Sequence, residues 1–568
     1  MSDKTAELVN ILKSRRVPTF LPGDLAYERS VVNPNLLYRF ARPDCVVQPE
    51  SASHVQRIVR EAKKRNIKLV IKNGGHSYAG FSTAERGSIS LDLSRMNDVE
   101  IDDEVKIVTV QGGAVWAHAY RQLVNGRHDG YIINGGRCPS VGVSGFILGG
   151  GLSPFTRSYG MGCDTLKEVT IVTADGELVT VKNTDDPKSK EGRLFWALCG
   201  AGGGNFGVVV ELKLAIQELR NNGKLVVAGR YTWAPKKDDM DEFIKAMNDF
   251  YAVQWPNNMT IDSSWLCDLS KTGTELEVRF PFYFDGSKDD FDKEINKSIN
   301  HPELKKQLKR RSVEEKSTRF LHETLVAQWS EETQKALPSQ ASYRIYTSFI
   351  FKTNSDFPKI IEIIRNEMAS FKKEFVGEQG LLQVTFIHAG GKASEKKRSA
   401  TAFRWRDALY HAYIMLEWND KWLERDMRGF CQKMKEKLKP FSMMKRAAFI
   451  NFPDGTLTQS MHERVYYGNN RQELQRLKQI WDSENFFSWA QGVQLPPGVT
   501  PRAAQPDAVA MAIRSIAAPE EDEAISGEET AVDEQALTDT IAKDQWENYN
   551  PPLANDIFGT QGLPFTGF

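Results

Sequence analysis

The chain has no excess of charge of either sign, with 74 Lys and Arg residues against 74 Asp and Glu residues among 568. No net field attracts nucleic acid or an anionic membrane, and neither partner is expected. It also lacks any apolar run of about 18 residues, which excludes a membrane-spanning helix on length. Residues 1–16 contain no apolar stretch typical of a secretory signal, so we expect a cytoplasmic protein.

Cysteine is scarce, and the six cysteines are scattered without a CxxC pair. This argues against a zinc site and against a dense disulfide framework, so no metal is predicted and a reducing compartment fits best. Residues 202–207 satisfy the GxGxxG pattern, but a helical pattern precedes them and a strand pattern follows at 208–214. A dinucleotide-binding loop needs the opposite order, so an ordinary NAD-binding fold is not expected.

The length suits two or three domains. Residues 1–217 are rich in glycine and short strand patterns, whereas residues 218–440 alternate long helical patterns with aromatic strands, which is typical of an α+β domain. Residues 441–497 are expected to return to the first domain. Residues 498–568 are Pro-rich and acidic, and are predicted to be mostly unstructured or docked on the surface by their apolar end.

Two glycine-rich loops carry the side chains of greatest chemical interest, with His76 in residues 74–80 and Cys138 in residues 136–142. The spacing of apolar residues predicts a helix over 53–65, capped by Ser53, and then a strand over 68–71 that leads into the first loop. Glycine lets the backbone approach a flat or phosphorylated ligand closely, although a tight turn is the more common reason for it. A lone cysteine is usually a small buried hydrophobe, but a cation such as Arg137 beside it favours the reactive thiolate.

Several segments resemble the berberine-bridge-enzyme-like branch of the FAD-linked oxidases, which are flavoproteins of the vanillyl-alcohol-oxidase type. The resemblance covers roughly residues 42–219 and 390–496, and it is carried by the segments 72–80, 136–142, 149–151, 203–207, 449–452 and 482–487. It implies an α+β, two-domain fold of the PCMH type, in which residues 1–217 and 441–497 form the FAD-binding domain. The inserted residues 218–440 then form an α+β substrate domain on an antiparallel sheet, and we expect a monomer.

By this resemblance the flavin is attached twice, with His76 bonded to the 8α-methyl carbon and Cys138 to ring carbon C6. Two tethers raise the reduction potential of the flavin in this family. Val141 falls at the position that gates oxygen, where Val is associated with oxidases, so the resemblance favours O₂ as acceptor and H₂O₂ as product. Phe146 departs from the family, many of whose members have a histidine there. The other FAD-binding residues implied are Asn73, Gly74, Gly75, Ser77, Tyr78, Gly142, Gly145, Gly150, Gly151, Asn205, Gly207, Val208 and Asn451.

Candidates for acid–base chemistry lie on a predicted strand over residues 409–418, whose alternation places His411 and Tyr413 on its polar face. By resemblance this strand covers the substrate side of the flavin. Tyr413 is interpreted as a base or a hydrogen-bonding orienter, and as a base it needs a cation to lower its pKa, such as His411, Arg404 or Arg406. The alternative is that both residues only line the sheet. His388 is a weaker candidate with a structural role as its alternative.

Together these features predict an FAD-dependent oxidase of a small-molecule alcohol, or less readily of an amine, on a sugar-like, aryl or secondary-metabolite substrate. A dehydrogenase with an acceptor other than O₂ is the nearest alternative. A flavin-holding protein without turnover is a further alternative, because the family histidine at Phe146 and the family Glu or Gln at Tyr413 are both replaced.

Overall fold

A computed structural model describes residues 2–501, and most of the predicted unstructured tail therefore lies outside the described residues. The first sheet has the order β1 (Thr19–Phe20), β2 (Cys45–Val47), β4 (Ser88–Asp92), β3 (Lys68–Lys72), with β2, β4 and β3 parallel. Helix α3 (Ala52–Lys64) packs on it through Val55, Ile58 and neighbouring apolar residues, as its 3.6-residue spacing predicts. The helix is capped by Ser51, which accepts a hydrogen bond from the backbone N–H of His54, and not by Ser53.

A second, antiparallel sheet stands beside the first. Its order is β5 (Val99–Asp102), β6 (Ile107–Gln111), β10 (Gly207–Ala215), β8 (Leu166–Thr173), β9 (Leu178–Lys182). Helix α7 (Lys190–Leu198) precedes the glycine cluster at 202–207 and strand β10 follows it. This is the helix-then-strand order predicted from the sequence, so the cluster lacks the context of a dinucleotide-binding loop.

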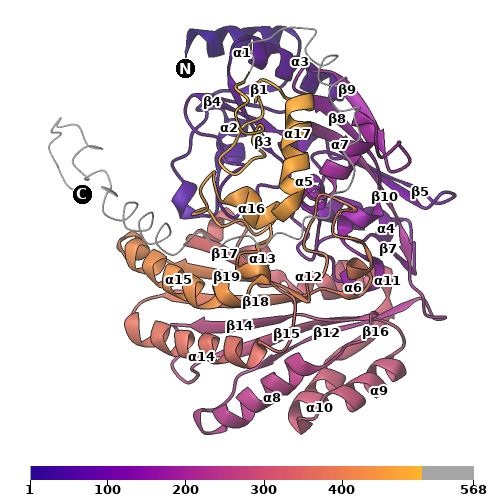
Figure 1. The fold of residues 1–568 in the computed structure, drawn as a ribbon, viewed down its shortest axis with the longest axis vertical. Helices are drawn as coiled ribbons and strands as arrows, with labels where there is room; N and C mark the ends of the chain where they lie inside the picture. Colours follow the sequence, from indigo (N-terminus) through magenta and orange to yellow (C-terminus); the bar gives the residue numbers. More distant parts are fainter. Residues whose placement is uncertain (1, 502–568) are drawn as a thin grey trace, which may run out of the picture. The chain divides into compact units, whose positions relative to one another are not determined.

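The largest sheet is antiparallel and belongs to residues 225–418. Its order is β16 (Ser312–Lys316), β12 (Leu225–Trp233), β15 (Glu277–Asp285), β14 (Ser263–Asp268), β18 (Gly380–His388), β19 (Tyr410–Trp418), β17 (Tyr343–Phe351), with β13 (Met259–Ile261) paired to β15. Helices cover one face, as Figure 1 shows: α8 (Met240–Ala252), α9 (Lys288–Ser298), α10 (Pro302–Arg310), α14 (Phe357–Glu374) and α15 (Glu424–Leu438). The opposite face shares a core with the first part of the chain. The sheet therefore forms one wall of the space between the two parts.

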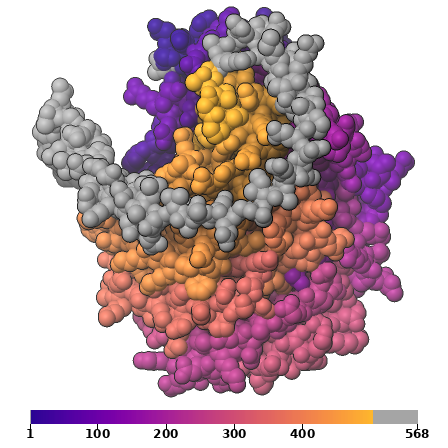
Figure 2. Space-filling view, in the orientation of Figure 1, coloured from indigo at the N-terminus to yellow at the C-terminus, as the bar shows by residue number. Residues whose placement is uncertain are grey.

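The last described segment returns to the first part of the chain. Helices α16 (His462–Tyr467) and α17 (Arg471–Trp481) lie against α7 and the glycine cluster, and Figure 2 shows this segment in yellow among the indigo elements. The buried Lys478 ammonium donates to the carbonyls of Asn205 and Phe487 and to the Asp482 carboxylate, each at 2.7 Å. The described residues form one unit of contacts, so domain boundaries at 217, 440 and 497 stay predictions.

Within residues 2–501, no helix combines the length and apolar character needed to cross a membrane. All six cysteines are free thiols. In the same range, His, Cys, Asp and Glu side chains form no group of three or more suited to hold a metal ion.

Candidate functional site

The side chains of His76 and Cys138 meet at Ser140. His76 Nε2 lies 3.0 Å from Ser140 Oγ, and Cys138 Sγ lies 3.3 Å from the same oxygen. The loop after β3 and the loop before α5 (Val143–Leu148) touch backbone to backbone, since a Cβ on Gly74 would lie 2.6 Å from Gly142 N and 2.7 Å from Ser140 O. Both reactive atoms can therefore reach one three-ring ligand.

The surroundings of His76 suit attachment to a ligand. Burial lowers the pKa of its imidazole to about 4, so the ring is neutral at pH 7 and has a free electron pair on nitrogen. Its side chain is nevertheless only partly covered, as are all the residues from Asn73 to Phe81, so the loop lines open space inside the protein.

Glycine positions in the site leave room for a flat group with a phosphate tail. A Cβ on Gly145 would meet no atom within 4 Å, and one on Gly203 would meet only Leu148, at 3.7 Å. Asn73 donates to the carbonyl of Gly112, while its Oδ1 is buried without a partner among the described residues and is available to a ligand donor. A neutral imidazole, a thiol, open glycines and an unused acceptor fit FAD.

Several predicted FAD-binding residues are occupied by the protein itself. The Asn205 side chain donates to Ala201 O and accepts from Trp489 and from the backbone of Val493, so its amide is fully used. Gly207 lies so close to β8 that a Cβ would be 2.3 Å from a backbone oxygen, and Val208 is buried in the core under the first sheet. Asn205, Gly207 and Val208 therefore have packing roles that the sequence analysis did not assign.

The remaining predicted residues surround the two loops. Ser77 accepts from the N–H of Phe81 and so fixes the loop, and Asn451 donates to the carbonyl of Phe146 at the end of α5. Val141 is partly buried against the main core, beside Cys138 in the chain. The other glycines there, Gly75, Gly142, Gly150 and Gly151, lie in the same two loops or directly after α5.

Aromatic rings join the His76 loop to the large sheet. Tyr78 is stacked on Tyr346 of β17 with ring centroids 3.9 Å apart, and the Tyr413 ring of β19 lies 6.2 Å from Tyr78. Phe452 completes the group, 4.9 Å from Tyr413. The structure thus brings Tyr413 to the His76 loop, on the sheet face that alternation predicts.

The cations proposed to lower the pKa of Tyr413 do not do so. Burial lowers the pKa of His411 to about 3, so the ring is uncharged, and it packs on Phe403 and Phe449. Arg406 is paired with Asp164 at 2.7 Å, and Arg404 packs on Gly468. Burial and the nearby Glu332 carboxylate raise the pKa of Tyr413 well above its usual value. Tyr413 is therefore a neutral phenol whose Oη accepts a hydrogen bond from Gln383 at 3.1 Å, and none of the three proposed cations supports a tyrosinate.

His388 lies on the wrong face for catalysis. It pairs across the sheet with Tyr410, on the helix-covered face, and stacks on that ring at 5.1 Å. Its Nδ1 accepts from the backbone of Ile261, and burial lowers its pKa well below the usual value. Its role is structural.

Arg137 does not act as a free cation beside Cys138. The Asp262 carboxylate binds its guanidinium at 2.7 and 3.1 Å, and Leu152 O accepts a third hydrogen bond. Because Asp262 also accepts from the backbone N–H of His388, the ion pair anchors the Cys138 loop to the large sheet. Arg137 therefore positions the Cys138 loop, and it is not the free cation that was expected to favour the thiolate.

One carboxylate in this site, Glu332, is not predicted from the sequence. Glu332, on the short helix α13 (Ser330–Gln334), accepts hydrogen bonds from Gln383 and Lys335, each at 3.2 Å. Its neighbour Thr333 places Oγ1 3.5 Å from Cys138 Sγ. In the sequence, residues 330–335 read as a charged surface segment, and no pattern distinguishes Glu332 from the adjacent Glu331.

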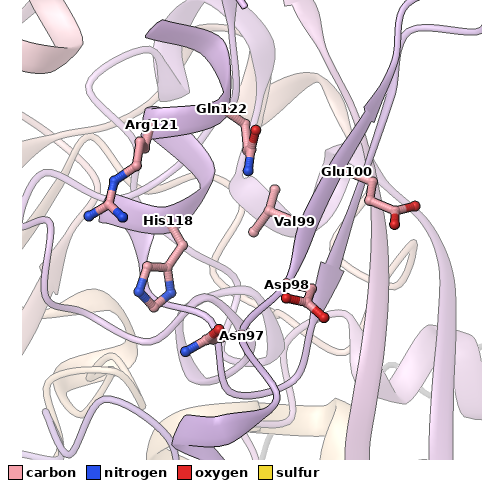
Figure 3. A pocket seen from close by; sticks show the side chains of 7 residues that line it. All are labelled: Asn97, Asp98, Val99, Glu100, His118, Arg121 and Gln122. Atoms are coloured by element: carbon pink, nitrogen blue, oxygen red, sulfur yellow. The ribbon is translucent and has the colours of Figure 1, made fainter. Parts of the chain in front are cut away.

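A surface cavity of about 410 Å³ lies elsewhere, between α4 (Trp116–Asn125) and β5 (Figure 3). His118 and Arg121 from the helix and Asn97 to Glu100 from the other side line it, and none of the predicted site residues does. It is separate from the site around His76.

Comparisons with known proteins agree with this geometry. The family described as FAD binding domain matches residues 43–182, which include both loops, and the family described as berberine and berberine like matches residues 448–494. Berberine bridge enzyme-like 12 of Arabidopsis thaliana is 28% identical over 519 residues, covering 86% of this chain and 92% of the relative. The carbohydrate oxidase of Microdochium nivale is 37% identical over 206 residues, covering 36% of this chain and 40% of the relative.

Solved structures show the same fold. Berberine bridge enzyme from Eschscholzia californica has a TM-score of 0.72 at 20% identity, over 86% of this chain and 99% of that chain. Phl p 4, a grass pollen allergen with glucose dehydrogenase activity, has the same TM-score and identity over 86% and 99%. The predicted α+β fold of the PCMH type is confirmed, and with it the predicted family resemblance.

Proposed function

Because residues 43–182 match the FAD binding domain family and residues 448–494 match the berberine and berberine like family, we propose that the protein is an oxidase whose FAD is attached covalently through His76 and Cys138. His76 bonds the 8α-methyl carbon and Cys138 bonds ring carbon C6. The substrate is a small alcohol, with an amine as the second choice, and O₂ is reduced to H₂O₂.

One observation carries this proposal: His76 Nε2 and Cys138 Sγ both contact Ser140 Oγ, at 3.0 and 3.3 Å. A neutral imidazole and a thiol held this close can bond to one edge of a single isoalloxazine. The contact between their two loops requires glycine at position 74, and the positions of the tethers are therefore determined by backbone packing.

When bound, FAD supplies an acceptor for the hydrogen and electron pair of a substrate C–H bond. The chain's own residues bind and orient the substrate. Tyr413, which stays protonated, donates a hydrogen bond to the substrate oxygen, and the rings of Tyr78, Tyr346 and Phe452 form an apolar wall against which an aryl or sugar ring packs.

Val141 supports O₂ as the acceptor. It is a small branched side chain three residues after Cys138, partly buried against the main core, and by resemblance it holds the position that gates oxygen in the family. Among the similar structures, an isoleucine-to-valine variant of Phl p 4 is described as a glucose oxidase, whereas the wild type is described as a glucose dehydrogenase. The valine at position 141 therefore favours the oxidase over the dehydrogenase in this proposal.

Acid precipitation tests the attachment. The wild-type pellet should stay yellow, whereas the double variant His76→Ala, Cys138→Ala should release its colour into the supernatant. Cys431→Ala, a buried thiol in α15, is the matched control and should leave the pellet yellow. A colourless wild-type pellet would contradict the covalent attachment.

A further inference from the structure

A buried carboxylate from a third part of the chain faces the site. Helix α13 crosses the space between the Cys138 loop and the large sheet, because Thr333 contacts Cys138 and the adjacent Glu332 contacts Gln383 of β18. The Glu332 side chain is 15% exposed, so it is enclosed by protein but keeps an open edge. It therefore lies between the tethered edge of the flavin site and the sheet that carries Tyr413.

The amide nitrogen of Gln383 lies within hydrogen-bond distance of both Glu332 and Tyr413, and also of Thr385 Oγ1 at 3.0 Å. Gln383 Nε2 donates to Glu332 Oε1 at 3.2 Å and to Tyr413 Oη at 3.1 Å. Two oxygens bound to one nitrogen at these distances lie at most about 6 Å apart, and an oxygen that hydrogen-bonds to both can span up to about 5.5 Å. A substrate hydroxyl in this gap can accept from the Tyr413 phenol and donate to the Glu332 carboxylate at the same time.

Lys335 balances the charge of Glu332 and has a second carboxylate partner when that charge is lost. Its Nζ lies 3.2 Å from Glu332 Oε1 and 3.8 Å from Glu417 Oε2, and that Glu417 oxygen is buried without a hydrogen bond among the described residues. When Glu332 gains a proton, the ammonium keeps a carboxylate partner in Glu417. Proton uptake therefore does not leave a buried charge unpaired.

The other titratable groups near the site are unsuited to accept a proton at neutral pH. Tyr413 is a neutral phenol with a raised pKa, and His76 is reserved for the flavin. His411 packs between two phenylalanine rings, and its Nδ1 has no partner in the described chain. Glu332 is the anion that the geometry places next to Tyr413.

We infer that Glu332 is the catalytic base of the proposed oxidation, and this inference rests on the proposed function. The O–H proton of the substrate passes to a Glu332 carboxylate oxygen while Tyr413 donates to the same substrate oxygen. FAD, when bound, would supply the acceptor for the C–H hydrogen and its electron pair; the O–H bond pair would become the second C–O bond, and the substrate would be oxidised by two electrons to a carbonyl. The protonated carboxyl then loses its proton to solvent through its open edge.

The pH dependence follows from the groups that face Glu332. They come from the residue after α13, from β15, the His76 loop, β17 and β19: Lys335, Arg279, His76, Tyr78, Tyr346 and Tyr413, with Glu417 of β19 on the far side of Lys335. Burial alone raises the pKa of Glu332, but Lys335 and the Gln383 hydrogen bond outweigh it, so this pKa lies below the usual value of 4.5. A base must be deprotonated, so the rate of flavin reduction should fall only below about pH 4.5.

The experiment compares Glu332→Gln with Glu331→Gln in the flavin-loaded full chain. Glu331 is the matched control, because it sits on the same helix but turns outward to Arg230 at 2.8 Å. Stopped-flow reduction is followed with D-glucose, cellobiose, xylobiose and 4-methoxybenzyl alcohol. In Glu332→Gln the rate of flavin reduction should be at least about 10²-fold lower, and the fall in this rate at low pH, its acid limb, should be absent. In Glu331→Gln the rate should stay within about twofold of wild type.

A resting-state readout separates a base from a structural residue. The visible spectrum of the bound flavin is titrated without substrate, and a transition below pH 4.5 should be present in wild type and Glu331→Gln but absent in Glu332→Gln. If Glu332→Gln is unstable or loses flavin, Glu332→Asp keeps the carboxylate and should retain both the transition and part of the rate.

The outcomes distinguish the two proposals. If a donor reduces the flavin of the wild type and reduces that of Glu332→Gln at the same rate, the inference is overturned and the oxidase proposal stands. The same follows from a slow Glu332→Gln variant that keeps the acid limb and the spectral transition. A wild type that keeps a covalent flavin but is reduced by none of the four donors overturns the proposed oxidation, and the role of Glu332 with it.

Discussion

Replacing Gly74 by Ala tests whether backbone packing between the two loops sets the positions of the tethers. The new Cβ would lie 2.6 Å from Gly142 N and 2.7 Å from Ser140 O, both backbone atoms that cannot rotate away. Since non-bonded heavy atoms prefer separations of about 3.5 Å, one loop must move by about 0.5 to 1 Å. Such overpacking costs about 1–3 kcal/mol of the free energy of unfolding.

We expect Gly74→Ala to impair the covalent attachment of FAD more than it impairs folding. A displacement of about 1 Å in a reacting group can lower a rate on the order of 10²-fold, and here it separates His76 from Cys138. Intact-protein mass spectrometry measures the fraction of chains carrying FAD, and treatment with trypsin locates each bond. We expect Gly74→Ala to fold, with a lower midpoint of thermal unfolding, and to lack one of the two bonds in most molecules.

Gly429→Ala provides the matched control for this substitution. Gly429 lies inside helix α15, and a Cβ there would meet nothing within 4 Å. The same chemical change should raise the free energy of unfolding by about 0.5–1 kcal/mol, since alanine favours a helix over glycine, and leave both bonds intact. If Gly74→Ala carried two flavin bonds with wild-type stability, the close approach of the loops would be refuted.

Two further predictions concern oxygen access and the return of the C-terminal segment. Val141→Leu should slow reoxidation of the photoreduced enzyme in air-saturated buffer by about tenfold or more, because a rise of only 1.4 kcal/mol in the barrier suffices; unchanged stopped-flow traces would remove Val141 as the gate. Lys478→Met should lower the free energy of unfolding by about 3–5 kcal/mol, since it leaves the buried Asp482 carboxylate unpaired. Denaturant unfolding measures this, with the exposed Lys188→Met as control, and a loss below about 1 kcal/mol would contradict the role of the buried ion pair.

The sequence predicts those parts of the fold that depend on local periodicity. The alternation over 409–418 places Tyr413 and Met415 on one face of β19 and Ile414 and Leu416 on the other, and the two core clusters divide these residues in this way. The same test applied to 381–388 would have placed His388 with Leu382 and Val384, on the helix-covered face. That misassignment was avoidable from the pattern alone.

The role of Glu332 depends instead on how distant elements pack. It belongs to a run of short helical pieces after β16, one of them a π-helical turn at Phe320–Thr324, and no apolar period marks which side faces inward. Its partners Gln383 and Tyr413 lie about 50 and 80 residues further along the chain and meet only through the register of β18 with β19. Residues 330–335 contribute to the site only because α13 packs against the Cys138 loop, and the local sequence does not specify this packing.

Burial acts on the site by removing charge from every group that would compete with Glu332. It lowers the pKa of His76 to about 4 and raises the pKa of Tyr413 well above its usual value, so both stay neutral at pH 7. Glu332 keeps its charge because Lys335 and Gln383 bind it. Glu332 is the carboxylate that shares the Gln383 amide with Tyr413, and this defines the direction of proton transfer, from the substrate hydroxyl toward α13. Removing Lys335 should therefore raise the pKa of Glu332 and shift the acid limb of flavin reduction to higher pH, whereas a role confined to packing would leave that limb in place.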